Sequence, residues 1–227
     1  TCALPISYFF KEKSRLKFNS PTEPRDFQEE ARTGLVLFAR RFSNIVSPPI
    51  MYAILGFAVT FSTMPFGPAL GWGVAYGLLV SLFPILVVVA MLQLGYVKEL
   101  HMSNTRERRV PYLSAVLGAV IIWLLALWFD LDSRFVSLTL FTAINLTLLF
   151  IITLYWLISM HTAGAAAFTA IIGVLWGWVM AGLLGLPVLL SVTAARLYLR
   201  RHSVSQALAG ILLGFSTVGL MSWLGYF

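Results

Sequence analysis

Three short polar segments, each next to long apolar runs, carry the residues that could do chemistry. One holds Arg196 and His202, six positions apart, and another holds His161. The third, at 97–111, is rich in basic residues. Ionisable groups placed at membrane depth are costly and are usually functional. These segments are therefore candidate parts of one site. The basic residues of the third segment are Lys98, Arg106, Arg108 and Arg109.

The residue types in these segments suit a ligand that carries phosphate. An arginine guanidinium is a planar fork whose N–H groups match two phosphate oxygens. Helix starts expected near Thr162 and Ser203 would add unpaired backbone amides, which favour an anion. Of two histidines beside a phosphate, one can attack phosphorus while the other protonates the leaving oxygen. The pattern predicts an anion site with a nucleophile and an acid.

The composition is that of a membrane protein with many spans. Of 227 residues, 59% are hydrophobic and 11% are charged, and the mean hydropathy is +0.86. Apolar runs of the roughly 20 residues that cross a bilayer recur along the chain. The net charge of +7 does not indicate a nucleic-acid partner, because the basic residues flank the apolar runs as they do on a membrane face. The expected partner is the lipid bilayer.

The apolar runs predict an all-α fold, a polytopic integral membrane bundle of about six to seven transmembrane helices. We expect one transmembrane domain at 46–227, preceded by a basic segment at 1–45. Prolines and glycines between the apolar runs mark the turns. The expected spans are 47–64, 69–96, 112–129, 135–158, 162–180, 184–200 and 204–226.

The segment at 26–45 has the pattern of an amphipathic helix on the membrane surface. Its apolar residues recur at helical spacing, with Arg40 and Arg41 on the opposite face. Asp26 could cap this helix, and the residues before it could equally form a solvated basic tail. Since the chain starts at Thr1 without a methionine, we expect this end to be a fragment or a processed terminus. The apolar residues are Leu35, Leu37, Phe38, Phe42 and Ile45.

Counting the spans places all the polar segments on one side of the membrane. The N-terminal segment, the loop at 97–111, the corner Ser159–His161 and the turn Arg196–His202 are separated by two crossings each. Of the 16 lysines and arginines, all except Arg134 lie on that side. The positive-inside rule predicts that this face is cytoplasmic. We expect an integral protein of a bacterial inner membrane, with its polar site on the cytoplasmic face.

The turn before the last span resembles the third motif of the type-2 phosphatidic acid phosphatase superfamily, SRxxxxxHxxxD. Ala195-Arg196 is followed by five residues, then His202, then three residues and Gln206, so the spacing is kept. The residues after it, Leu208–Gly214, also resemble the last helix of the superfamily. This motif is the most specific part of the resemblance.

Two further segments match the superfamily more loosely. The corner Ile158-Ser159-Met160-His161 is similar to its PSGH motif in the serine and the histidine. Lys98 and Arg109-Val110-Pro111 are similar to its first motif, a lysine followed by an arginine–proline pair. The resemblance covers about 97–215.

The resemblance implies a hydrolase that acts on lipid phosphomonoesters or (poly)prenyl pyrophosphates. His202 would be the nucleophile that forms a phosphohistidine, His161 would protonate the leaving group, and Arg196 would hold the phosphoryl oxygens. The superfamily requires no metal or other cofactor, and three histidines without nearby carboxylates also argue against a metal centre. Other phosphate-binding residues implied by the resemblance are Arg109, Lys98, Arg106 and Ser159.

Gln206 departs from the motif, which has an aspartate there to orient the catalytic histidine. The glutamine oxygen can accept a hydrogen bond from the ring, but it cannot stabilise an imidazolium. Ser203 and Gln206 also fit a capping box, in which Gln206 bonds to the Ser203 amide instead. Ala195 likewise replaces the serine of the motif.

Other interpretations stay open. The chain could be a catalytically impaired relative that binds or transports lipid phosphates. His161 and His202 could be interface histidines without a chemical role, and Arg200 and Arg201 could be positive-inside anchors. A prenyl-transferring enzyme is disfavoured, because that chemistry needs aspartate-rich motifs and the polar face has no aspartate except Asp26.

Overall fold

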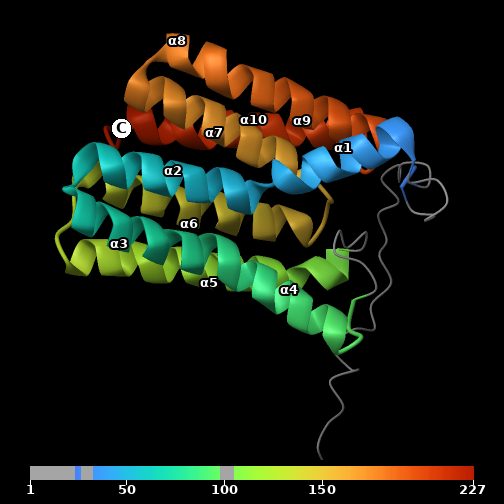
Figure 1. Cartoon of the computed structure of the whole chain (residues 1–227), viewed down its shortest axis with the longest axis horizontal. Helices are drawn as coiled ribbons and strands as arrows, with labels where there is room; N and C mark the ends of the chain where they lie inside the picture. The colour runs from blue at the N-terminus through green and yellow to red at the C-terminus, as the bar shows by residue number, and fades with distance from the viewer. Residues whose placement is uncertain (1–23, 27–32, 98–104) are drawn as a thin grey trace, which may run out of the picture.

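The computed structural model describes residues 24–26, 33–97 and 105–227, and these residues form an all-α bundle (Figure 1). The chain passes back and forth along the bundle, with short turns at its two ends. The helices are α1 (Gly34–Ile45), α2 (Pro48–Thr63), α3 (Phe66–Tyr76), η3 (Gly77–Leu82), α4 (Phe83–Gln93), α5 (Thr105–Trp128), α6 (Ser133–Thr153), α7 (Met160–Trp176), α8 (Trp178–Met180), η4 (Ala181–Gly185), α9 (Leu186–Tyr198) and α10 (Val204–Trp223).

Five helical stretches of the described residues are long and apolar enough to cross a membrane. Two of them contain a short π-helical turn: α3, η3 and α4 make up Phe66–Gln93, and α8, η4 and α9 make up Trp178–Tyr198. The others are in α5, α6 and α10. α2 passes the same test only together with α1, and α7 is a shorter apolar helix. The predicted helical membrane bundle is thus confirmed.

The amphipathic helix predicted at 26–45 is shorter, because α1 begins at Gly34. It exposes Leu35 and Phe38 and buries Ala39 and Ser43. The prolines at the start of α2 favour a new helix there. The axes of α1 and α2 are bent by 41° relative to each other. Asp26 does not cap α1, whose N-cap is Thr33, and its carboxylate is instead buried against arginines. The predictions for 1–23 lie outside the described residues.

The loop predicted at 97–111 was too long, because α5 already begins at Thr105. The helix therefore continues through Pro111. Residues three and four apart lie on the same face of a helix. Arg108 and Tyr112 consequently share one face of α5, whereas Arg109 is rotated away from it. This phase decides which arginine reaches the interior.

Small residues bring α7 and α10 into close contact. A Cβ atom built on Gly214 would overlap the carbonyl oxygen of Ala163 and approach the backbone nitrogen of Ala167 to 2.8 Å. Thr162 Oγ1 also donates to the carbonyl of Ala207 over 2.9 Å. Small side chains let helix backbones approach closely in lipid, which is what the density of small residues indicates here.

Gly214→Ala is expected to destabilise the bundle, because the added methyl would press on the backbone of α7. Overpacking of this kind costs about 1–3 kcal/mol and should lower the melting temperature in detergent by about 2 °C or more. Gly219→Ala is the matched control on the same helix, because no atom lies within 4 Å of its added Cβ. A melting temperature of Gly214→Ala equal to that of the control would contradict the close packing.

Candidate functional site

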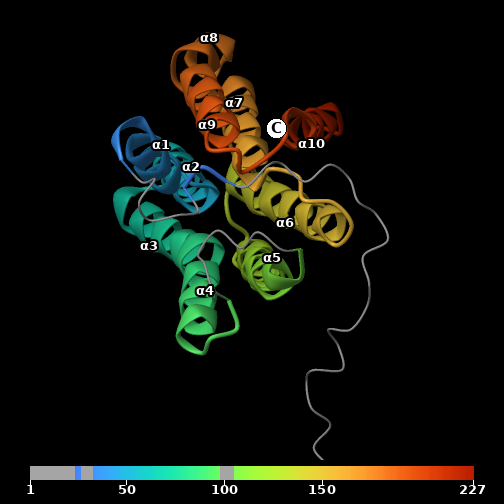
Figure 2. The same cartoon turned by 90° about the vertical axis from the view of Figure 1, so that its right-hand side faces the viewer.

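The polar segments meet at one end of the bundle, as the sequence predicts. This end gathers α1, the start of α5, the corner before α7 and the turn between α9 and α10 (Figure 2). The connections before α3, α6 and α8 lie at the other end (Figure 1). The predicted alternation of the spans is therefore confirmed for the described part of the chain.

A cavity of about 280 Å³ opens at this end, and its wall has two parts. Arg108, His161, Arg196 and His202 form the part with basic side chains. No carboxylate of the described residues lines the cavity. The other part is largely apolar. It includes Pro48, Ile50, Val80, Ile85, Val88 and Leu146.

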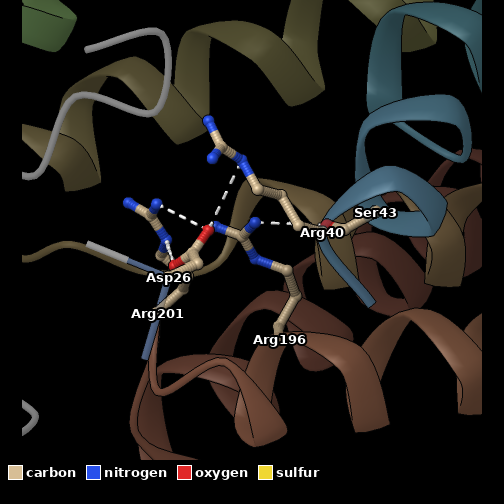
Figure 3. A network of polar contacts seen from close by, with 5 residues as sticks. All are labelled: Asp26, Arg40, Ser43, Arg196 and Arg201. Carbon is tan, nitrogen blue, oxygen red and sulfur yellow. Dashed lines mark hydrogen bonds and ion pairs between the residues drawn. The ribbon is translucent and has the colours of Figure 1, made fainter. Parts of the chain in front are cut away.

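Arg196 lies in the last turn of α9 and is only 2% exposed. One of its terminal nitrogens donates to Ser43 Oγ over 3.2 Å (Figure 3). Its Nε has no hydrogen-bond partner, and its guanidinium forms no ion pair with a carboxylate of the described residues. A buried guanidinium with unused donors favours an anion in the adjoining cavity.

His202 lies in the turn before α10 and is buried. Burial of the ring, together with the positive charges of Arg196 and Arg108, holds its pKa well below the usual value of 6.5. The ring is therefore neutral at pH 7, the form in which a histidine nitrogen can act as a nucleophile. Its Nδ1 is buried and has no hydrogen-bond partner among the described residues.

His161 lies in the first turn of α7, directly after the residues that cap this helix. Ser159 is the N-cap, and its Oγ accepts a hydrogen bond from the Thr162 amide over 3.4 Å. The Ser159 amide donates to the carbonyl of Gln206 over 3.1 Å, which ties the start of α7 to the start of α10. The two histidine-bearing segments are thus held together by the backbone. Ser159 is buried in this cap and does not line the cavity.

Gln206 forms the capping box that the sequence left open as one alternative. Its Oε1 accepts a hydrogen bond from the Ser203 amide over 3.0 Å, and the Ser203 Oγ accepts one from the Gln206 amide over 3.3 Å. The side-chain oxygen thereby stabilises the helix start. Gln206 still lies near His202, since it opposes the lowering of the pKa of that ring.

The structure does not bring all the predicted phosphate-binding residues together. Arg109 is exposed and does not line the cavity, because it is rotated out of the face that carries Arg108. Lys98 lies outside the described residues, as does the side chain of Arg106. Arg108 was missed as a favoured candidate, although the spacing of Arg108, Pro111, Tyr112 and Ala115, all in the cavity wall, is helical.

The sequence also missed the partner of Arg201. Its guanidinium donates two hydrogen bonds to Asp26, over 2.9 and 2.8 Å, and its side chain is 4% exposed. A buried, two-bond ion pair is not the solvated membrane anchor that the run of basic residues indicated. Arg200, its neighbour, is exposed.

Acidification should destabilise the protein through His202. Because its pKa is lowered in the folded protein, the unfolded chain binds more protons between that pKa and about 6.5. Stability should therefore fall as the pH drops below about 6.5, by up to about 1.4 kcal/mol per pH unit. Melting curves in detergent between pH 7.5 and 5 test this, and His202→Gln should remove most of the slope. An equal slope in the variant would contradict it.

The described residues contain no group of three or more His, Cys, Asp or Glu side chains that could hold a metal ion. Comparisons of the chain with protein-family models, curated proteins and solved structures gave no match. The residues of the cavity and the motif spacing that they carry are therefore what indicates the function.

Proposed function

We propose that this integral membrane protein is a phosphatase that hydrolyses a lipid phosphomonoester or (poly)prenyl pyrophosphate through His202. One observation carries the proposal. His161, Arg196 and His202, from two separate segments, line one cavity whose remaining wall is largely apolar. A lipid phosphate needs both parts, cationic donors for the phosphoryl oxygens and an apolar wall for the chain.

The cavity also has the size and the position expected for such a ligand. About 280 Å³ holds a phosphoryl group and the first atoms of the chain, but not a whole lipid. Ile50 and Ile85 line the cavity and are 41% and 38% exposed, so its apolar part reaches the outer surface of the bundle. The remainder of the lipid chain would stay in the bilayer.

The proposed reaction has two steps. A nitrogen of neutral His202 attacks phosphorus, the bond between phosphorus and the leaving oxygen breaks, and protonated His161 gives its proton to that oxygen. Arg196 and Arg108 bind the phosphoryl oxygens, whose charge grows during the attack. Water then attacks the phosphohistidine, His161 takes a proton from this water, and inorganic phosphate leaves His202 in its neutral form.

A second candidate is binding or transport of a lipid phosphate without hydrolysis. The observation that favours it is the residue type at 206, because the amide oxygen of Gln206, which also accepts a hydrogen bond from the Ser203 amide, carries no charge that could stabilise an imidazolium at His202. An imidazole without a carboxylate partner would still contact the phosphate. Such a protein would bind lipid phosphates through Arg196 but release no phosphate.

The proposed site faces the cytoplasm of a bacterium, with the protein in the inner membrane. The support is the positive-inside rule applied to the arginines of α1 and of the α9–α10 turn. The C-terminus lies at the other end of the bundle (Figure 1), so a C-terminal alkaline phosphatase fusion should be active. If the alkaline phosphatase fusion is inactive and a fluorescent protein fused to the same terminus is bright, the C-terminus is cytoplasmic and the site faces the opposite side of the membrane.

The decisive experiment measures phosphate release by the purified protein in detergent. The panel contains phosphatidate, phosphatidylglycerol phosphate and a polyprenyl pyrophosphate, and binding of each lipid is measured in parallel. Release from at least one lipid supports the phosphatase. Binding without release supports the second candidate, and neither binding nor release would overturn both.

A further inference from the structure

Residues 24–26, which we call the N-terminal strap, lie against the turn between α9 and α10. The Arg25 amide donates to the carbonyl of Leu199 over 3.1 Å, and the Arg25 guanidinium lies 4.6 Å from the centre of the Tyr198 ring. Asp26, the next residue, is 1% exposed. The strap is therefore bound through its backbone, through a cation–π contact and through a buried carboxylate.

Asp26 is the centre of an ion-pair cluster (Figure 3). Arg201 donates to both of its carboxylate oxygens, over 2.9 and 2.8 Å, and Arg40 of α1 lies 3.8 Å away. Two-bond pairs of arginine and carboxylate fix the relative position of their partners as well as attracting them. The pair is buried on both sides, so removing either charge would leave its partner less well compensated.

The turn that Asp26 holds is the one that carries His202. Arg200 has a φ of +53°, a left-handed conformation that is uncommon outside glycine and persists only where the surroundings hold it. The Arg201 amide donates to the carbonyl of Arg196 over 3.1 Å, and His202 is the next residue. Besides this bond within the turn, the side chain of Arg201 receives a contact from outside it, from the strap.

We infer that the strap is part of the functional site and that Asp26 is a positioning residue. Through Arg201, its carboxylate fixes the turn that sets His202 beside Arg196 in the cavity wall. The chemical meaning of this positioning rests on the proposed function. Gln206 carries no charge, and the carboxylate that steadies the histidine segment comes from the N-terminal strap, through Arg201, one residue before His202.

The test follows the histidine rings directly and does not require activity. The full chain, with ring-¹⁵N-labelled histidines, is studied by NMR in detergent, and His202→Ala assigns the signal among the three histidines. Asp26→Asn and the milder Arg201→Lys, which keeps the charge but loses the two-bond geometry, should shift or broaden the His202 signal. The exchanged pair Asp26→Arg with Arg201→Asp should move it back towards the parent position.

Kinetics add a second readout. Asp26→Asn should lower kcat for phosphate release about tenfold to a hundredfold while KM stays within about threefold, since the bound lipid is held by other residues. Asp132→Asn is the matched control, because Asp132 caps α6 at the other end of the bundle by accepting a hydrogen bond from the Arg134 amide. It should change neither the His202 signal nor kcat.

An unchanged His202 signal in folded Arg201→Lys and Asp26→Asn would overturn the inference. So would an exchanged pair that melts like the parent but leaves the signal displaced. Should Asp26→Asn not fold, Arg201→Lys and the exchanged pair decide. If the parent hydrolyses none of the lipids, the proposed hydrolysis fails, while the His202 signal in the same variants still decides the role of the strap.

Discussion

His202→Ala is expected to reduce phosphate release by at least about 10³-fold, to the background of a protein-free sample. The reason is that the proposed reaction forms a bond between phosphorus and a nitrogen of this ring, and alanine offers no replacement. Lipid binding should change by less than about tenfold, because Arg196 and Arg108 remain in the cavity wall. Both quantities are measured on the same purified protein in detergent.

Two controls separate loss of chemistry from loss of fold. The variant should melt within a few degrees of the parent, and rapid acid-free quenching should trap phosphohistidine in the parent but not in the variant. His101→Ala, at the one histidine that matches no motif, should keep its activity. Release by His202→Ala within tenfold of the parent would contradict the nucleophilic role of this ring and leave it as a buried histidine of the α9–α10 turn.

The helices could be predicted from the sequence because each span is a long apolar run between polar turns. Alternation of the spans then determined which polar segments meet, and the structure brings His161, Arg196 and His202 to one cavity as this argument requires. For this result, the number of spans between the polar segments mattered more than the spacing of residues within the turn. Losing one span from the count would have put His161 on the opposite face from Arg196.

The details of the site could not be predicted, because they depend on helix phase and on long-range contacts. Arg108 and Arg109 are neighbours in a basic run, and only the start of α5 at Thr105 decides that Arg108 faces inward. The pairing of Asp26 with Arg201 joins residues 175 positions apart, which no local pattern indicates. From the sequence alone, Asp26 is therefore interpreted as a helix cap.

The charge balance of the site follows from the positions of Arg108 and Asp26, which the sequence did not predict. Asp26 neutralises Arg201, so that guanidinium is already occupied within the protein. The cationic groups that line the cavity are instead Arg108 and Arg196, on α5 and α9. Folding thus separates two arginines of the α9–α10 segment: Arg201 lies in an internal ion pair and Arg196 lies in the cavity wall.

Gln206→Asp is expected to raise phosphate release, by about tenfold or more. The change puts a carboxylate at the position where the motif has one, next to a ring whose neighbours Arg196 and Arg108 both disfavour an imidazolium. A carboxylate fixes the tautomer of the ring and stabilises the positive charge that it acquires on attack. The size of such an effect is known from the serine-protease triad, where replacing the aspartate by asparagine lowers kcat about 10⁴-fold.

The same substitution disturbs the capping box, so its effect must be separated from that of the helix start. Gln206→Ala removes the bond to the Ser203 amide without adding charge and should cost about 0.5–2 kcal/mol of stability with no gain in release. Gln206→Glu keeps a residue type that suits the capping box. It should raise phosphate release less than Gln206→Asp does, because the glutamate carboxylate stays bonded to the Ser203 amide. Equal release by the Asp and Ala variants would show that a carboxylate at 206 does not reach His202. If the parent releases no phosphate and only Gln206→Asp does, the protein is a lipid-phosphate binder that lacks hydrolysis because of the residue at 206.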